Sequence, residues 1–497
     1  MKVGFLSFFV QNYPIPHGGT RKMITKIKDK DVVRAIEEQR IEDEKFRAER
    51  WEYLRSCLAA EAGGESADEI IDALKYMFAL FTPGIVDWFA GLYDGDIGAW
   101  YYSNSARENP QFLPDIESTA QALGFIASTG MAGNCGMSIS HVLPERMCKD
   151  IVAFAKGLQD ENGFFYHPQW GKVATDANLS RRGRDVGMAS IVFKRLDSAP
   201  TYDTPNGDIG DGILANGERI EKRNVAEVKE QRSSAALPDH LSSKEKFEAY
   251  LETLDINGSS YVNGSILEAQ AFQIVTRDSQ LEAEGADYRL TDILHRWLNA
   301  HQNPKTGLWT LTDEPTFEGV NGLLKITSVY NKIKKELPNP ITALKSAMCG
   351  ITFAEEPETV CFVLNPWYAI SVVVTNATSF NSSSDKEALE AEVGAFKRAL
   401  FDNYPALVRT TADNMKKFRK DDGSFSYLQH RTAASSQGMP VAVMGANEGD
   451  INATICIRSV LGHVMDILGH YGTVPMYMKS DLMRYITIIN ERWGTND

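Results

Sequence analysis

Residues 94–126 read DGDIGAWYYSNSARENPQFLPDIESTAQALGFI, and the order of features in this stretch decides the fold because it recurs along the chain. The stretch opens with a glycine-containing turn, continues through the aromatic residues Trp100, Tyr101 and Tyr102, and reaches Pro114 after a polar connection. A helix is then predicted with Asp115 at its start, where a carboxylate suits the exposed N–H groups. Turn, aromatics, connection and helix form one repeat unit.

Three further stretches follow the same order: residues 158–166 (LQDENGFFY), 302–309 (QNPKTGLW) and 420–427 (KDDGSFSY). Two more apolar helices, beginning near Asn263 and Asn365, lack the full turn. Six apolar helices are therefore predicted, near residues 115–128, 184–196, 263–276, 320–333, 366–376 and 450–468. Amphipathic helices are predicted at 145–157, 243–254, 286–301, 338–348, 386–417 and 479–492.

This alternation predicts an all-α fold of the (α/α)6 toroid type, a double-walled helical barrel. Inner helices of such a barrel are shielded all round, whereas outer helices show one face to water. We expect a helical arm over residues 1–90, a toroid domain over residues 91–497, and a polar surface insertion at about 198–243.

Composition excludes several classes of function. The formal net charge of −14 argues against nucleic-acid binding, which requires a basic face. No run approaches 18 apolar residues, so we expect no membrane span. Six scattered cysteines without a CxxC pair indicate reduced thiols in a cytoplasmic protein. The histidine spacing predicts no metal site, and the absence of a phosphate-binding glycine motif predicts no cofactor. The oligomeric state stays open.

The turn Q-x(2–4)-G-x-F/W followed by a buried helix resembles the repeat of the α/α-toroid proteins, which include terpenoid cyclases and protein prenyltransferases. The resemblance covers most of residues 94–470. The chain lacks the Asp-x-Asp-Asp acid motif of a class II terpene cyclase, and no prenyltransferase-like zinc ligand set stands out. In layout it resembles carbohydrate-active toroids, namely glycoside hydrolases and polysaccharide lyases of the heparinase and alginate-lyase type. The resemblance implies an enzyme that cleaves glycosidic bonds, with uronate-containing oligo- or polysaccharides favoured.

In such a barrel the starts of the inner helices and the preceding turns meet at one mouth. Candidate substrate-binding residues there combine aromatic faces for sugar rings with cations and polar groups. They are Trp100, Tyr101, Tyr166, His167, Trp170, Arg184, Trp309, Lys325, Trp367 and Arg431.

Elimination on a uronate is the slightly preferred reaction. It requires an amide to neutralise the sugar carboxylate, a base for the C5 proton and an acid for the leaving oxygen. Asn321 is the candidate neutraliser, with Asn263 and Asn365 as alternatives and Arg184 in support. The candidate bases are His430 and the pair Tyr166–His167, and the candidate acids are Tyr102 and Tyr427.

Hydrolysis by two carboxylates, as in a glycoside hydrolase, is the main alternative. The candidate carboxylates lie at predicted helix starts: Asp115, Glu117, Asp185, Glu318, Glu448 and Asp450. Glu448 and Asp450, in the sequence NEGDIN, are the first pair to test. Two further alternatives are a terpenoid cyclase-like enzyme with an unfamiliar acid motif and a non-catalytic glycan-binding toroid.

Overall fold

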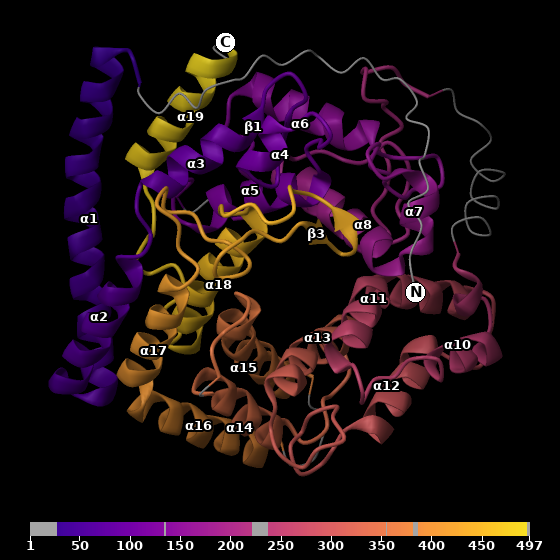
Figure 1. The fold of residues 1–497 in the computed structure, drawn as a ribbon. Helices are drawn as coiled ribbons and strands as arrows, with labels where there is room; N and C mark the ends of the chain where they lie inside the picture. The colour runs from indigo at the N-terminus through magenta and orange to yellow at the C-terminus, as the bar shows by residue number, and fades with distance from the viewer. Residues whose placement is uncertain (1–26, 134–135, 221–236, 354, 381–385, 495–497) are drawn as a thin grey trace.

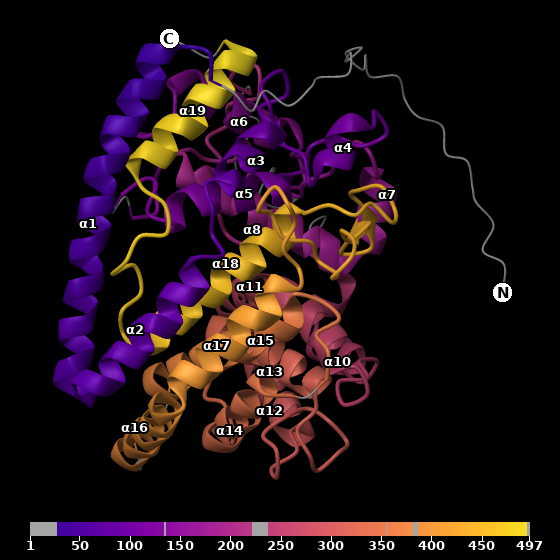
Figure 2. The same ribbon diagram turned by 60° about the vertical axis from the view of Figure 1, so that its left-hand side comes forward.

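Helices make up nearly all the regular structure of this protein (Figures 1 and 2). The computed structural model describes residues 27–133, 136–220, 237–353, 355–380 and 386–494. In chain order the elements are α1 (Lys30–Ala62), α2 (Gly64–Phe78), α3 (Gly84–Leu92), β1 (Tyr93–Asp94), β2 (Ala99–Trp100), α4 (Asn104–Glu108), α5 (Ile116–Ser128), α6 (Glu145–Gly157), α7 (Gly171–Ala177), α8 (Leu179–Arg195), the 3-10 helix η1 (Asp239–Leu241), α10 (Lys244–Leu251), α11 (Ser260–Ala283), α12 (Leu290–His301), α13 (Phe317–Ile333), α14 (Pro340–Ile351), α15 (Cys361–Ser379), α16 (Lys386–Asp402), α17 (Tyr404–Lys416), β3 (Ser435–Ser436), β4 (Met439–Pro440), α18 (Ile451–Ile467) and α19 (Lys479–Trp493). The predicted all-α class is confirmed.

Six helices form a closed ring in the order α5, α8, α11, α13, α15, α18. Each contacts the next, and α18 contacts α5, so that the ring is complete. Figure 1 shows the six arranged around a common centre. These are the six helices predicted from their apolar sequences, and their long buried runs reflect packing against neighbours on both sides and against a further helix outside.

Outside the ring lie the helices predicted to be amphipathic. α6 contacts α8, α12 contacts α11, α14 contacts α13 and α15, and α17 contacts α15. α14 lies close to the ring: a Cβ on Gly350 would be 3.1 Å from Pro366 in α15 and 3.3 Å from Val320 in α13. Several helix ends differ from the predicted ones by a few residues, and the segment 386–417, predicted as one helix, forms two helices. Pro405 in the first turn of α17 has no N–H to continue the preceding helix.

The first and last helices, α1 and α19, pack against each other beside the ring (Figure 2). α1 contacts α2 and α19, α2 contacts α17, and α19 contacts α3. The backbone N–H of Ser480, at the start of α19, donates to the buried Asp43 carboxylate of α1 at 2.8 Å. Residues 1–26 of the predicted arm lie outside the described residues. Among the described helices, none combines the length and apolar character needed to cross a bilayer.

The predicted insertion at 198–243 is in part an ordered layer on α6. The Lys156 ammonium of α6 binds the Asp211 carboxylate at 2.7 Å, and Gln159 donates to the Tyr202 carbonyl at 2.8 Å. Residues 221–236 of the insertion lie outside the described residues. The five cysteines that the structure describes are free thiols: Cys57, Cys148, Cys349, Cys361 and Cys456.

The recurring turn of the sequence is a small hairpin in all four copies. Residues on either side of the turn pair antiparallel: Tyr93 with Trp100, Gln159 with Phe165, Asn303 with Leu308 and Arg419 with Phe425. The glycine of each turn has a positive φ, at 78° for Gly98, 84° for Gly163, 68° for Gly307 and 90° for Gly423. The repeat is therefore a structural unit that leads from an outer helix into an inner one.

Gly307 illustrates why the turn requires glycine, and it carries our first prediction. Its φ disfavours any side chain, and a Cβ would lie 2.5 Å from the backbone nitrogen of Ala343 in α14. Gly307→Ala should lower the free energy of unfolding in urea by about 2 kcal/mol or more. Gly285→Ala is the matched control, because Gly285 has a φ of +78° but no atom within 4 Å of the place that a Cβ would occupy; it should cost about 1 kcal/mol. Equal losses of unfolding free energy in the two variants would show that the close contact between residue 307 and α14 does not contribute.

Candidate functional site

The inner face of the ring carries a stripe of residues, most of them half-buried; Glu117, Ser328, Cys361 and Asn365 are buried and Phe272 is exposed. On α13, Val320 is buried against α14, whereas Asn321, Lys325 and Lys332 lie on another face and retain partial exposure. Residues spaced four, three and four apart share one face of a helix. The same spacing occurs on the other ring helices. We call these residues the inner stripe: Glu117, Gln121, Gly124 and Ser128 on α5; Arg184, Met188 and Ile191 on α8; Tyr261, Ser265, Glu268 and Phe272 on α11; Asn321, Lys325, Ser328 and Lys332 on α13; Cys361, Asn365, Tyr368 and Val372 on α15; and Asn452, Cys456, Ser459 and His463 on α18.

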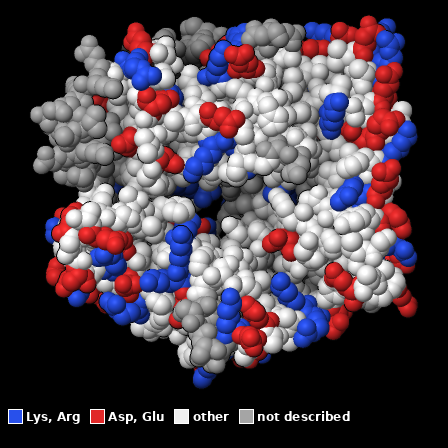
Figure 3. All heavy atoms as spheres, turned by 180° about the vertical axis from the view of Figure 1, so that it is seen from behind, with Lys and Arg blue, Asp and Glu red and all other residues white. Residues whose placement is uncertain are grey.

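Contacts between inner-stripe residues of neighbouring helices show that the stripes meet around the centre. Gln121 of α5 bonds to Asn452 of α18, and Tyr368 of α15 stacks on His463 of α18 with ring centroids 4.2 Å apart. Seen from behind, the molecule is hollowed at its centre, and Lys and Arg side chains stand around the hollow (Figure 3). The inner stripe is therefore the surface that a ligand in this hollow would meet.

Two amide pairs make the hollow rich in hydrogen-bond donors. The Asn365 amide nitrogen donates to the Asn321 side-chain oxygen at 2.8 Å, and the Gln121 amide nitrogen donates to the Asn452 oxygen at 2.9 Å. In each pair the acceptor residue uses its oxygen and retains an NH₂ group with two donors. Asn321 and Asn452 are half-buried, so these donors are accessible from the hollow.

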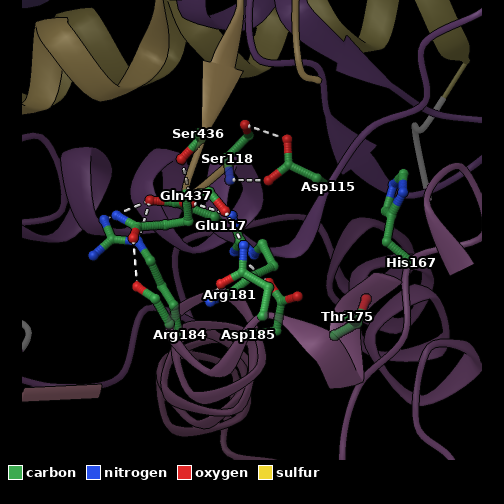
Figure 4. A network of polar contacts seen from close by, with 12 residues as sticks. Asp115, Glu117, Ser118, His167, Thr175, Arg181, Arg184, Asp185, Ser436 and Gln437 are labelled. Atoms are coloured by element: carbon green, nitrogen blue, oxygen red, sulfur yellow. Dashed lines mark hydrogen bonds and ion pairs between the residues drawn. The ribbon is translucent and has the colours of Figure 1, made fainter. Parts of the chain in front are cut away.

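A buried charge network joins α5 to α8 at the start of both helices (Figure 4). The Arg181 guanidinium donates to the Glu117 carboxylate at 2.8 Å and to Asp185, and Arg184 also binds Glu117. Burial raises the pKa of Glu117, but the charges of Arg184 and Arg181 outweigh burial and hold that pKa at about 2. Burial raises the pKa of Asp185 to about 6, although Arg181 opposes this shift.

A hairpin formed by β3 and β4 is fastened over this network. The Ser436 hydroxyl donates to Glu117 at 2.9 Å. Gln437 accepts two bonds from the start of α8, through its carbonyl from Asn178 at 2.8 Å and through its side-chain oxygen from Ser180 at 2.6 Å. Figure 4 shows Ser436 and Gln437 above the ends of α5 and α8. Arg181 and Glu117 are thus sealed from water, whereas Arg184 retains some exposure toward the hollow.

The carboxylate Glu268 of α11 lies between two lysines of α13. The Lys325 ammonium is 2.8 Å from one Glu268 oxygen, and the Lys332 ammonium is 3.6 Å from the other. Burial raises the pKa of Glu268, but the charges of Lys325 and Lys332 outweigh burial and lower it. Both carboxylates of the inner stripe, Glu117 and Glu268, are therefore ionised at neutral pH.

No family model, curated protein or solved structure matches this chain. The candidate site is consequently defined by its own geometry.

Five of the sequence-predicted residues lie on the inner stripe: Asn321, Asn365, Glu117, Arg184 and Lys325. Three predicted aromatic platforms do not reach the hollow, and this corrects the expectation for them. Trp100, Trp309 and Trp367 are fully buried, and their indole nitrogens donate to the Tyr485 hydroxyl, the Leu298 carbonyl and the Thr411 hydroxyl. They are core residues, with no face left for a sugar ring.

The predicted carboxylates are mostly structural. Asp115 is the N-cap of α5 and accepts from the backbone and hydroxyl of Ser118 at 2.8 and 2.7 Å. Asp450, fully buried, is the N-cap of α18 and accepts from Ala453, Tyr427 and Thr432. Glu448 accepts from the backbone of Ser105 at 2.8 Å. Asp450 and Asp185 cannot contact a substrate in this conformation, because both are buried.

The remaining predicted residues lie in the layer above α5 and α8 or at the surface. Tyr102 is buried beneath Val441 and Ala442. His167 is buried; its Nε2 bonds to the Pro114 carbonyl at 2.8 Å, and burial lowers its pKa to about 4. Its ring stacks on half-buried Trp170 at 4.0 Å.

Two tyrosines are held by carboxylates outside the ring. Tyr101 donates to Asp94 at 3.3 Å, and Tyr166 donates to Asp176 at 2.8 Å. His430 and Arg431 are exposed on a turn. The predicted base His430 therefore does not lie on the inner stripe.

Sequence reasoning missed much of the inner stripe, including Glu268, Lys332 and His463. The signal was available, because polar residues at the four-three-four spacing interrupt otherwise apolar helices. The candidate carboxylates at helix starts include N-cap residues, which lie at the mouth of the ring but bond to their own helix.

Asp450 gives a prediction about pH. Burial raises its pKa to about 6, against bonds from the backbone N–H groups of Ala453 and Tyr427. The folded state then holds this proton between about pH 4 and 6, where the unfolded aspartate has lost it. The free energy of unfolding should fall as pH rises through this window, by about 3 kcal/mol, and level off above it. Asp450→Asn, which keeps a capping oxygen, should show a correspondingly smaller slope in urea unfolding from pH 4 to 7. Equal slopes would mean that Asp450 is ionised throughout.

Proposed function

We propose that this protein is a carbohydrate-active enzyme of the α/α-toroid superfamily that cleaves uronate-containing oligo- or polysaccharides by β-elimination. The observation that carries the proposal is the donor-rich inner stripe, in which Asn321, Asn452, Arg184 and Lys325 present N–H groups to one hollow. The hollow offers more N–H donors than free acceptors, and this suits a ligand that carries a carboxylate.

Elimination agrees better than hydrolysis with the state of the acids. A glycoside hydrolase requires one carboxylic acid that keeps its proton at working pH. The two carboxylates of the inner stripe are held ionised by cations, as described above. The carboxyl groups with raised pKa, Asp185 and Asp450, are enclosed by protein. The arginine and lysines of the hollow also argue against a terpenoid cyclase-like cavity, which should be lined by aromatic residues.

Residues of three ring helices and one turn lie near one another at the mouth. Asn321 contacts Asn365, one turn along α15 from Cys361, and the Cys361 thiol lies 3.2 Å from the Tyr427 hydroxyl. Tyr261 of α11 also interacts with Cys361, and the Lys325 ammonium lies 5.8 Å from the Tyr261 ring centroid. An amide donor and two phenols thus meet within reach of one sugar unit.

In the proposed reaction, Asn321 and Arg184 hold the uronate carboxylate and stabilise negative charge as the C5 proton leaves. Tyr427 replaces Tyr102 as the acid for the leaving oxygen, since burial raises the pKa of Tyr427 and keeps it protonated. Tyr261 is assigned as the base. Burial and the neighbouring Cys361 thiol raise its pKa, against the charge of Arg184, so only a small fraction of the molecules carries the ionised base, and the rate should rise with pH through the whole alkaline range without reaching a plateau.

The test is a screen of uronate polymers for the ultraviolet absorbance of an unsaturated uronate product. Elimination creates this chromophore, whereas hydrolysis yields reducing ends without it. Reducing ends without absorbance would overturn elimination in favour of hydrolysis. Binding without either product would make the protein a glycan-binding toroid, and no binding to any acidic or neutral polymer would remove the carbohydrate proposal.

A further inference from the structure

The pair Lys325 and Lys332 carries more positive charge than its protein surroundings balance. Both ammonium groups share the single carboxylate of Glu268, at 2.8 and 3.6 Å. Among the described residues, this is the only carboxylate within ion-pair distance of either lysine. One positive charge in this part of the hollow therefore lacks a protein partner.

The neighbouring charges do not supply the missing anion. Arg184 is a further cation of the hollow, and its partner Glu117 is shared with Arg181. The charge of Arg184 acts on Glu268 in the same direction as the two lysines. The surplus positive charge therefore lies on the side of the hollow that α11 and α13 form.

The two lysines are held in place yet accessible. Side-chain exposure is 16% for Lys325, 28% for Lys332 and 21% for Glu268, so all three reach the hollow while most of each is enclosed. Lys332 also donates to the Glu268 carbonyl at 3.1 Å, and its ammonium lies 5.3 Å from the Phe272 ring centroid. Enclosure of an unbalanced ammonium is unfavourable, and burial correspondingly lowers the pKa of Lys332.

We propose that Lys325 and Lys332 form a second anion-binding subsite, which binds a carboxylate or sulfate ester on a sugar next to the one held by Asn321. Glu268 is the resident counter-ion and yields part of its contacts when the ligand group arrives. The inference rests on the proposed function in taking the carrier of the anion to be a sugar. It narrows the substrate class to saccharides with at least two anionic groups.

The subsite can be tested by calorimetric binding to the full chain, with no turnover required. The probes are glucuronate with one carboxylate, digalacturonate with two, a disaccharide with one uronate and one sulfate ester, and neutral glucose. We expect a disaccharide with two anionic groups to bind about 10- to 100-fold more tightly than glucuronate. The two disaccharides distinguish a carboxylate from a sulfate ester at the second position.

Substitutions identify the residues. Lys332→Met should remove most of the advantage of the two-anion probes and leave glucuronate affinity unchanged, whereas Glu268→Gln should strengthen binding of every anionic probe. Lys149→Met, on the outside of α6 where Lys149 pairs with Glu145, is the control and should change nothing. Unchanged digalacturonate and sulfated-disaccharide affinity in a folded Lys332→Met variant would overturn the subsite. If Lys332→Met gives this result and the protein still cleaves a uronate polymer, the subsite is disproved and the proposed function stands. If the probes bind as expected but no uronate polymer is cleaved, the subsite stands and the proposed function is disproved.

Discussion

Replacing Asn321 by alanine is expected to lower kcat on a uronate polymer about 100- to 1000-fold, the usual cost of losing a donor that stabilises developing negative charge. Asn321 is the half-buried amide on α13 whose oxygen is already engaged by Asn365 at 2.8 Å, which directs its NH₂ group to the hollow. Since the donor acts mainly as charge develops, KM should change less than kcat. Steady-state kinetics followed by product absorbance measures both.

Two variants make the Asn321 result interpretable. Asn414→Ala removes a half-buried amide from the outer helix α17 and should leave kcat unchanged. Asn321→Asp keeps the shape but adds a negative charge beside the substrate carboxylate, and it should be at least as inactive as the alanine variant. Thermal unfolding of each variant separates lost catalysis from lost folding. A folded Asn321→Ala enzyme with wild-type kcat would disprove the assigned role.

Replacing Arg181 by methionine should destabilise the protein by about 3–5 kcal/mol, the largest stability effect that we expect. Arg181 has a side-chain exposure of 1%, and it is the shared partner of Glu117 and Asp185, each with 2%. Its loss leaves Asp185 without a cation and Glu117 with Arg184 alone. A buried carboxylate without a partner is costly, so the loss exceeds that of the pair itself. Urea unfolding at pH 7 measures the change.

Neutralising the partners tests this explanation. The triple variant Arg181→Met, Glu117→Gln, Asp185→Asn removes the unpaired charges and should recover part of the stability lost by Arg181→Met. Arg55→Met, which removes an exposed arginine paired with Asp68, should have no measurable effect. Should the triple variant be less stable than Arg181→Met, unpaired charge would not be the cause of the loss.

The order of apolar and amphipathic helices could be predicted from the sequence because a helix that is buried on all sides is largely apolar along its whole length. α13 and α15 read as apolar runs since they pack on both neighbours and on α14, and this pattern needs no knowledge of the partners. The break between α16 and α17 was less visible. Both helices are amphipathic, and only Pro405 marks the join.

The functional surface was harder to predict because the same residue types serve two purposes. Trp309 and Trp367 follow polar turns or begin inner helices, as a sugar platform would, yet their indole nitrogens find partners inside the protein. Asp115 and Asp450 are acids at helix starts, where capping and catalysis demand the same chemistry. Spacing along one helix face distinguishes Lys332 and Glu268, but their meeting depends on how α11 and α13 are aligned.

The contact between α5 and α18 has a consequence for biosynthesis. Gln121 and Asn452, which bond across this contact, are 331 residues apart in the chain. At about 5–20 residues per second, a ribosome needs roughly 15 to 70 s to deliver the second after the first. Through that interval the nascent chain carries an unclosed arc of helices whose end surfaces are apolar and unpaired. Shortened versions of the gene should therefore yield aggregating or chaperone-bound products in place of a smaller working protein.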